Sequence, residues 1–469
     1  MGILHGLEED LEKAEDYLDS AEAAVINCHR DADGLCGAAI IKDLLESHGV
    51  SCRIRGVLPN DLDKIEVFRG LNLFVDIGSG QIPLLAPRFS GSQTVIVDHH
   101  PPHGRSWKGL VHLNPHRIGA DGSTEVSGAG MAYLLARETS GDREMARVGV
   151  IGAVADRQDI LGELGGMNRE ILQDAVEEDQ VEELKDVLLF GRESKPLHLA
   201  LKSLTDPPIP GVSGMEAGSM QLLSDLGIPL KEGKGFRTLD DLTHDERRAL
   251  ASELIVRCMS LVSPKVSRYV PNLIIGSVYR MLGEQPPLQY AKEFATCINS
   301  AARMGLLEDV VDMLRGDRGD HYDRVMCGLK RYRLSLSENI RSVSSRGIDL
   351  AEGGYLQYFK SERTPKYILG PVTGLLLGEG VADPMKPLAG MVSEGSTKAS
   401  VRCSRLLVLE GIDLSECVRK AAQSVGGEGG GHRGAAGAFF RAGFEERFVK
   451  RLEMGLLEQV ESMGIESVP

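Results

Sequence analysis

Apolar positions in the first third of the chain follow two patterns, one typical of buried strands and one typical of amphipathic helices. Helical spacing over 7–20 and a helical stretch over 35–48 predict two early helices. Short continuous apolar runs predict buried strands at 23–28, 71–75 and 94–97, and a further strand is expected at 51–58. Strands that alternate with helices favour a parallel, doubly wound sheet, so we expect an α/β fold.

Several of these apolar runs end in residues that bind metals or carry protons. They are His29, Asp31 and Asp33 after the first run, Asp76 after 71–75, Asp98, His99 and His100 after 94–97, and Asp156 after the apolar run 147–154. Because strand ends of a doubly wound sheet share one edge, we expect these side chains to converge in one crevice. A single Asp in such a place is more often a helix cap or turn former, so the prediction depends on the whole set.

This set of side chains suits metal-assisted phosphoryl chemistry. Five carboxylates in one crevice cannot all ionise without cations to neutralise them. A mixture of carboxylates and imidazoles without thiolates favours Mn²⁺ or Mg²⁺. The ligands suffice for two divalent ions, and two ions about 3.5–4 Å apart can clamp a phosphorus centre during in-line attack.

The sequence from residue 122 onward predicts two more helices, an insertion and a second α/β unit. We expect helices from 122 to 136 and over the acidic stretch 170–189, and strands at 367–369 and around 400–402. Glycine-rich residues 425–437 let backbone N–H groups approach an anion. The predicted domains are a catalytic domain at 1–190, a mostly helical insertion packed on it at 191–320, a linker helix at 321–347, and a smaller α/β substrate-binding domain at 348–469.

The predicted helix 321–346 has one apolar stripe and an otherwise basic surface. The basic residues are Lys330, Arg331, Arg333, Arg341 and Arg346. A solvated linker helix is the interpretation that the sequence alone favours. The alternative is a basic wall for a phosphate backbone.

Composition narrows the functional class. The 469 residues are 42% hydrophobic and 26% charged, typical of a globular protein. The net charge of −15 argues against nonspecific coating of nucleic acid but is compatible with a nuclease built from carboxylates. Eight cysteines without a C-x-x-C pair, no signal peptide and no membrane-length apolar run predict a cytoplasmic protein with reduced thiols.

The motifs resemble the DHH phosphoesterase superfamily. His29-x-Asp31-x-Asp33, Asp76, Asp98-His99-His100 and Asp156 match its four metal motifs in order, and residues 430–437 resemble its associated second domain. Residues 298–305 resemble a RecJ segment, although Ala302 stands where RecJ often has Gly, and 398–402 resemble the RecJ Ser-x-Arg. The best fit is to archaeal RecJ-like proteins, including the GINS-associated nuclease.

The resemblance implies roles for individual residues. His29, Asp31 and Asp76 would bind one metal ion, and Asp33, Asp76, His99 and Asp156 the second, with Asp76 bridging. His100 would face the scissile phosphate, with Asp98 behind it. The implied substrate-binding residues are Asn299, Arg303, Ser400, Arg402, Gly430, Gly431 and His432. As alternatives, the two arginines would be ordinary surface residues and His432 a loop cap.

The resulting hypothesis is a two-metal exonuclease that digests single-stranded DNA from the 5′ end, trims RNA, and acts in DNA replication and repair. One alternative is a replisome scaffold that binds GINS and the MCM helicase; the eukaryotic relative in that assembly has lost metal ligands, whereas every ligand position is filled here. The other is an oligoribonucleotide or cyclic-dinucleotide phosphodiesterase, against which the long insertion and basic helix argue.

Overall fold

The computed structural model describes residues 4–463 except 161 and 379. It divides into two compact units, one of residues 1–186 and 276–332 and the other of residues 187–275 and 333–469. The range 191–320, predicted as one insertion on the catalytic domain, is therefore shared between the units at residue 275. The predicted boundaries at 190, 320 and 347 stay a prediction.

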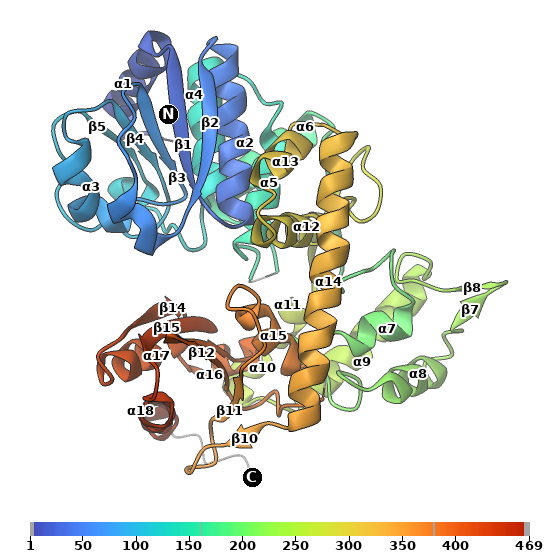
Figure 1. The fold of residues 1–469 in the computed structure, drawn as a ribbon. Coiled ribbons are helices and arrows are strands. Elements are labelled where there is room, and N and C mark those ends of the chain that lie inside the picture. Colours follow the sequence, from blue (N-terminus) through green and yellow to red (C-terminus); the bar gives the residue numbers. More distant parts are fainter. Residues whose placement is uncertain (1–3, 161, 379, 464–469) are drawn as a thin grey trace. The chain divides into compact units, whose positions relative to one another are not determined.

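A five-stranded parallel sheet forms the centre of the first unit, in the order β2-β1-β3-β4-β5 (Figure 1). Its strands are β1 Ala23–His29, β2 Ser51–Val57, β3 Leu71–Val75, β4 Thr94–Val97 and β5 Leu110–Leu113. β3, β4 and β5 are buried along their whole length, as expected for strands covered on both faces. This confirms the predicted α/β class and parallel sheet.

The register of the sheet places three residues of the candidate site, His29, Asp76 and Asp98, in one row. Cys28, Val75, Val97 and Leu113 are paired across four neighbouring strands. The residues that follow them are His29, Asp76, Asp98 and Asn114. Backbone pairing therefore brings residues far apart in sequence to the same edge.

Helices cover both faces of this sheet. One face packs on a large core with α1 Glu8–Ser20, α2 Ala32–Ser47, α4 Gly128–Ser140 and α5 Ala146–Ala155. The other face, with Phe74 and Ile96, packs on α3 Ile82–Phe89 and the turn η1 Pro59–Lys64. The unit also contains α6 Gly166–Glu177, α12 Ala291–Arg303, α13 Leu307–Leu314, the short turns η2 Ser79–Gln81 and η3 Pro115–Ile118, and the two-stranded sheet of β6 Val181–Val187 and β9 Ile275–Met281.

Residues 187–275 form a helical part of the second unit with its own hydrophobic cluster. Its elements are α7 Leu197–Lys202, α8 Glu216–Asp225, β7 Lys231–Glu232, β8 Gly235–Phe236, α9 His244–Met259, α10 Pro264–Ser267 and α11 Val270–Ile274. Asp206 accepts hydrogen bonds from Arg405, and Glu410 accepts two from Ser263. These contacts join the helical part to the C-terminal part of the same unit.

The C-terminal part of the second unit is built on a mixed six-stranded sheet in the order β10-β11-β12-β13-β15-β14. Its strands are β10 Asp349–Leu350, β11 Gln357–Ser361, β12 Leu388–Glu394, β13 Ser396–Arg402, β14 Glu428–His432 and β15 Ala435–Arg441. Its helices are α15 Leu369–Leu376, α16 Arg405–Glu410, α17 Leu414–Gln423 and α18 Glu445–Met463. Residues of α17 and α18 pack with Ala399, Val401 and Phe440 on one face of this sheet.

Four local predictions are wrong. The run 147–154 is the helix α5, so Asp156 reaches the site from a helix end and not from the sheet edge. The helix predicted over 170–189 ends at Glu177 in α6, and residues 181–187 form the strand β6, because pairing with β9 overrides the local helical pattern there. Residues 367 and 368 form a turn and Leu369 begins α15, and the helix predicted from 122 begins only at Gly128, with Ser127 as its cap.

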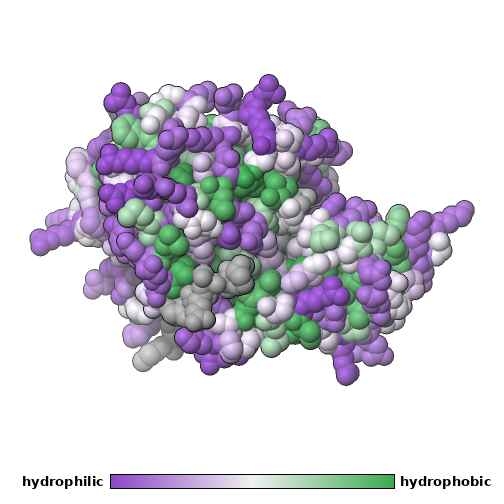
Figure 2. All heavy atoms as spheres, turned by 90° about the horizontal axis from the view of Figure 1, so that it is seen from below, coloured by the Kyte–Doolittle hydropathy of each residue, from purple (hydrophilic) through white to green (hydrophobic). Residues whose placement is uncertain are grey.

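The predicted long helix is α14, Asp320–Arg346, and its five basic residues named above are all exposed. Cys327 on α14 is the one exposed cysteine among the described residues. Hydrophilic side chains dominate the face of the molecule seen in Figure 2, with smaller hydrophobic patches between them. None of the described helices is long and apolar enough to cross a membrane.

Candidate metal centre

Candidate ligands lie within ligand-to-ligand distance in three overlapping groups in the first unit. The groups are Asp76 with Asp98, His99 and His100; His29 with Asp31 and Asp76; and Asp33 with His99 and Asp156. All eight side chains singled out from the sequence therefore come together. The assignment of each one to a particular ion stays a prediction.

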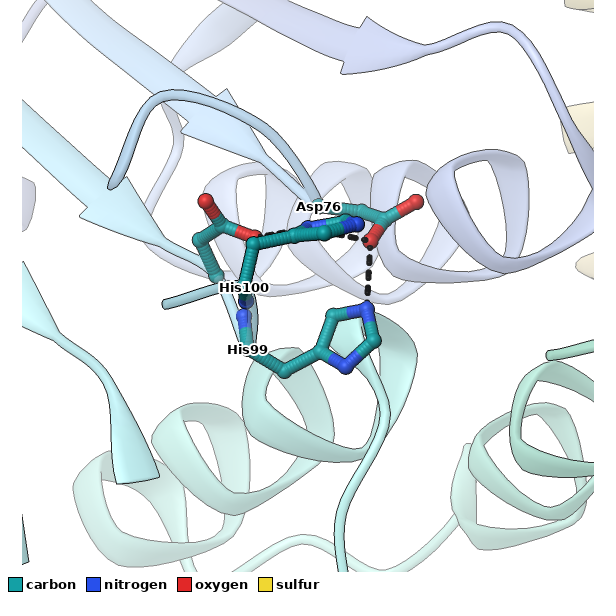
Figure 3. Close-up of side chains that lie close together, drawn as sticks. Asp76, His99 and His100 are labelled. Carbon is teal, nitrogen blue, oxygen red and sulfur yellow. Dashed lines mark hydrogen bonds and ion pairs between the residues drawn. The ribbon is translucent and has the colours of Figure 1, made fainter. Parts of the chain in front are cut away.

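Asp76 lies at the centre of this arrangement. Its backbone is left-handed, with φ of 58°, a conformation that Asp tolerates better than most residues. Its Oδ1 is 3.1 Å from His99 Nε2, and the same oxygen is buried without a well-aligned hydrogen bond from the described residues. Figure 3 shows the imidazoles of His99 and His100 directed at this carboxylate. A bound cation would satisfy a buried carboxylate oxygen that has no hydrogen bond.

Asp31 and Asp33 are positioned by the start of α2. Asp31 caps this helix through a hydrogen bond from the Gly34 N–H to its carboxylate. Asp33, in the first turn, accepts hydrogen bonds from the N–H groups of Gly128 and Ala129 at 2.7 and 3.0 Å. The first turn of α2 thus faces the first turn of α4 across the Asp33 carboxylate.

His99 is oriented by the backbone. Its Nδ1 lies 2.6 Å from the Gly122 carbonyl oxygen, which can only accept a hydrogen bond, so Nδ1 carries a proton. The other nitrogen, Nε2, is 3.1 Å from Asp76 and 3.8 Å from Asp33. A histidine that donates from one nitrogen to a carbonyl presents the other nitrogen for metal binding.

Asp98 is a fully buried carboxylate that holds His100. Its Oδ1 accepts hydrogen bonds from the N–H groups of His99 and His100 and lies 2.8 Å from His100 Nδ1, while Oδ2 accepts one from the Ser79 N–H. Burial opposes ionisation, but the bond and charge of His100 keep the pKa of Asp98 well below its usual range. His100 is 41% exposed. Its Nε2 is the ring nitrogen that Asp98 does not engage.

The proton affinities of the cluster favour bound cations. Burial, together with the neighbouring charges of Asp76 and Asp156, raises the pKa of Asp33 well above its usual value. Burial also raises the pKa of Asp156. Against burial, nearby carboxylates raise the pKa of His29 and His99. Crowded carboxylates that resist ionisation alone fit a divalent cation, which neutralises them in the charged form.

Two glycines allow the helices to approach these carboxylates closely. A Cβ on Gly128 would lie 2.5 Å from the Asp76 Cβ, and one on Gly152 would lie 2.6 Å from Asp33 Oδ1. Neither residue was singled out from the sequence. An isolated glycine in a helical pattern gives no sign of the neighbour that requires it.

Several polar residues that support the site were also missed. Ser79 Oγ is 2.8 Å from His112 Nε2 and accepts a hydrogen bond from Asn114 Nδ2, which also donates to the His100 carbonyl. Gln158 donates to Asp156 Oδ2 and to the Gly122 carbonyl. Apart from Asp156, which is two residues from Gln158, their partners are distant in sequence, so only the position of Asn114 directly after a strand could have indicated these residues.

The two predicted substrate contacts from α12 lie in this unit. Asn299 Oδ1 accepts a hydrogen bond of 3.0 Å from the N–H of Ala32, the first residue of α2. The Arg303 guanidinium lies 5.9 Å from the centre of the Tyr332 ring. Both residues are half-buried. Asn299 thus holds the helix that carries Asp33, and its role toward substrate stays a prediction.

The remaining predicted contacts are neighbours on the C-terminal sheet of the second unit. Ser400 on β13 pairs through Gly437 with Gly430 on β14, and Arg402 pairs through Ala435 with His432. Arg402 Nη1 donates to the carbonyl groups of Val401 and Ala436 at 2.9 and 3.3 Å. The Ser-x-Arg segment and the glycine-rich segment are therefore adjacent, as a shared binding role requires.

The sequence matches three protein families in succession. They are the DHH family N-terminal domain over residues 23–154, the DHH-CID domain over 189–270 and the DHHA1 domain over 379–456. An uncharacterized protein of Methanocaldococcus jannaschii is 26% identical over 447 residues, which cover 92% of this chain and 93% of that protein.

Solved structures share the fold. The structure of an exonuclease RecJ bound to manganese matches with a TM-score of 0.57 at 19% identity. The match covers 100% of this chain and 99% of the RecJ chain. RecJ from Thermus thermophilus with Mn²⁺ has a TM-score of 0.58 at 19% identity over 97% of this chain, which spans only 55% of that chain. CDC45 from Entamoeba histolytica matches with a TM-score of 0.61 at 13% identity. This match covers 96% of this chain and 97% of the CDC45 chain.

These matches define the class of protein. The chain has DHH, DHH-CID and DHHA1 domains in order and belongs to the DHH superfamily. Its fold is that of RecJ and CDC45.

Proposed function

We propose that this protein is a metal-dependent exonuclease that hydrolyses single-stranded nucleic acid from one end, DNA in the 5′ to 3′ direction, and also trims RNA. The observation that carries the proposal is the complete, converging ligand set around Asp76. Acting on strand ends, such an enzyme would serve DNA replication and repair.

The cluster fits two divalent ions, with Mn²⁺ favoured over Mg²⁺. His29, Asp31 and Asp76 would hold one ion, and Asp33, His99 and Asp156 the other, with Asp76 shared. Bound there, the ions supply the positive charge and Lewis acidity that phosphodiester hydrolysis requires. Asp98 holds His100 through Nδ1, so Nε2 is free to bind or protonate a phosphate oxygen.

The second group of residues would bind the end of the strand. Arg402 and Ser400 provide donors for a terminal phosphate, and His432 lies in the Arg402 row of the sheet. Gly430 and Gly431 let the strand approach the backbone. Asn299 and Arg303 are proposed to bind internal phosphates.

The test is digestion of single strands labelled at either end. Wild type with Mn²⁺ should release mononucleotides from 5′-phosphorylated DNA, and Asp76→Asn should lower the rate by at least about 10³-fold, since Asn cannot share a charge between two ions. Asp179→Asn is the matched control, because Asp179 also has a left-handed backbone, with φ of 51°, but is exposed and outside the cluster.

Comparing the two labelled ends, and DNA with RNA, tests the proposed polarity and substrate. Release from the 3′ end alone would contradict the proposed polarity. Digestion of RNA alone would contradict the DNA substrate. Preference for a dinucleotide over a long strand would favour the phosphodiesterase alternative. Full activity of Asp76→Asn would overturn the shared ligand.

A scaffold role is a second candidate, favoured by the likeness to CDC45. In that role the protein would bind GINS and the MCM helicase, with or without nuclease activity. Co-purification with GINS tests it, and Asp76→Asn should bind GINS as well as wild type does if the two roles are separate.

A further inference from the structure

The C-terminal sheet has one face that lacks the cover of α17 and α18. Ala399, Val401, Ala436 and Ala438 point into the core beneath these helices. Because side chains alternate along a strand, Lys398, Ser400 and Arg402 point to the opposite face. α15 packs against β12 and β13 there, and a Cβ on its Gly370 would meet Arg402 Nη2 and Ser400 Oγ.

On this face, the side chains of β13, β15 and β14 form three cross-strand rows. The first row is Arg402, Ala435 and His432, the second is Ser400, Gly437 and Gly430, and the third is Lys398, Phe439 and Glu428. The first row offers cationic donors. The second is nearly flat, and a Cβ on Gly430 would meet nothing within 4 Å. A ligand can therefore lie directly on the backbone between the outer rows.

Phe439 in the third row is a large apolar side chain that is 44% exposed on a strand. The Lys398 ammonium lies 5.5 Å from its ring centre, which fixes one flank of the ring. Glu428 lies opposite on the other side, so the row combines an aromatic face with a carboxylate that repels phosphate. With Lys398 on one side of the ring and Glu428 on the other, the row has no net charge, so a flat, partly polar group such as a nucleobase fits it better than a phosphate does.

The spacing between rows matches one nucleotide. Two residues along a strand span about 6.6 Å, so Phe439 lies one nucleotide's length from the Ser400 row. A phosphate bound by Ser400 and Arg402 would therefore place its own base over Phe439. Base stacking on an aromatic side chain is tolerant of sequence because every base has a π-face.

We propose that Phe439, flanked by Lys398, is the stacking site for the base of the terminal nucleotide, so that this domain recognises a nucleotide end and not a bare phosphoester. The inference rests on the proposed function for the phosphate contacts of Ser400 and Arg402. It adds a residue outside the family motifs, and it excludes inorganic polyphosphate as the preferred ligand.

The test measures binding in EDTA, where no hydrolysis occurs. Two 5′-phosphorylated, fluorescent single strands are compared by anisotropy, identical except that one has an abasic terminal nucleotide. Wild type should bind the abasic strand about tenfold more weakly. Phe439→Ala should bind both strands equally weakly, and Phe439→Tyr should restore the discrimination. Gly430→Val, whose side chain enters open space, should weaken binding of both strands.

Phe236→Ala is the matched control. Phe236 is also an exposed strand residue, at 47%, with Lys231 4.6 Å from its ring centre, but it lies on the β7–β8 hairpin. It should behave as wild type. Retained tenfold discrimination in Phe439→Ala would overturn the stacking site.

The outcomes separate this inference from the proposed function. A wild type that digests strands with Mn²⁺ but binds both strands alike would overturn the stacking site and leave the nuclease intact. A wild type that discriminates in EDTA but releases no nucleotide with Mn²⁺ would support the stacking site and overturn the nuclease.

Discussion

At the scale of single residues, Asp98 shows how one carboxylate orients the imidazole of a neighbouring residue, His100. It accepts bonds from three backbone N–H groups around the turn and binds His100 through Nδ1. The buried charge is fully partnered, so we expect Asp98 to affect a substrate only through the imidazole that it orients.

Substitution Asp98→Asn should therefore lower kcat about a hundredfold, because the amide cannot stabilise a charged imidazole in that position. His100→Ala should lower kcat by a similar factor. In the double variant the two effects should not add, since both remove the same oriented imidazole. Single-turnover rates of the four proteins measure this, and additive effects would contradict the positioning role.

His112 provides a test at low pH. Burial, and secondly the charge of Arg117, lowers its pKa to about 4 from the ordinary value of 6.5. The unfolded chain therefore binds a proton between pH 6.5 and 4 that the folded chain does not, and stability falls as the pH falls through this range. Wild type should lose more thermal stability than His112→Gln over this interval. If the melting temperatures of the two proteins fall equally as the pH is lowered, the titration of His112 is ruled out as the cause.

At the scale of elements, the site depends on the packing of helices against strand ends. Gly152 in α5 lies so close to α4 that a Cβ would come within 2.3 Å of the Ala129 Cβ and 2.6 Å of Asp33 Oδ1. The carboxylate position is thus set by how closely two helices can approach.

We expect Gly152→Ala to destabilise the protein by about 1–3 kcal/mol through overpacking and to displace Asp33. Gly374→Ala is the control, because Gly374 is also inside a helix and its Cβ would have nothing within 4 Å. The control should be neutral or stabilising, by up to about 1 kcal/mol. Melting temperature and Mn²⁺ affinity are the measurements, and equal behaviour of the two variants would contradict the argument.

The elements also show what the sequence can predict. Buried parallel strands form continuous apolar runs, so β1, β3 and β4 and the polar residues after them were predicted. The more exposed strand β2 and the helix α14 were predicted as well. β5 was missed because His112 interrupts its short apolar run. β6 was predicted as helix because its acidic local pattern gives no sign of β9, which lies far along the chain. The hydrogen-bonded partners of the metal cluster could not be predicted for the same reason.

At the scale of the whole molecule, we expect the cluster of carboxylates to make stability depend on divalent metal ions. The first unit gathers Asp31, Asp33, Asp76, Asp98 and Asp156 in one place within a chain of net charge −15. A cation that binds the folded state alone shifts the unfolding equilibrium toward that state.

Mn²⁺ at a hundredfold excess over its Kd should stabilise the wild type by about 2.7 kcal/mol per site, and EDTA should reverse the gain. Asp76→Asn should show a much smaller gain, since it removes the shared ligand. Calorimetry with and without Mn²⁺ measures this. The same increase in both proteins would place the stabilising ion elsewhere.

The exposed thiol on α14 has a practical consequence. Burial raises the pKa of Cys28, Cys258 and Cys417 to about 12, 11 and 12, which leaves almost no thiolate to react at neutral pH. Cys327, by contrast, is open to solvent on the helix that runs from one unit into the other. A maleimide dye should therefore label the native chain at this position first, giving a fluorescent reporter on the connecting helix without any engineered cysteine.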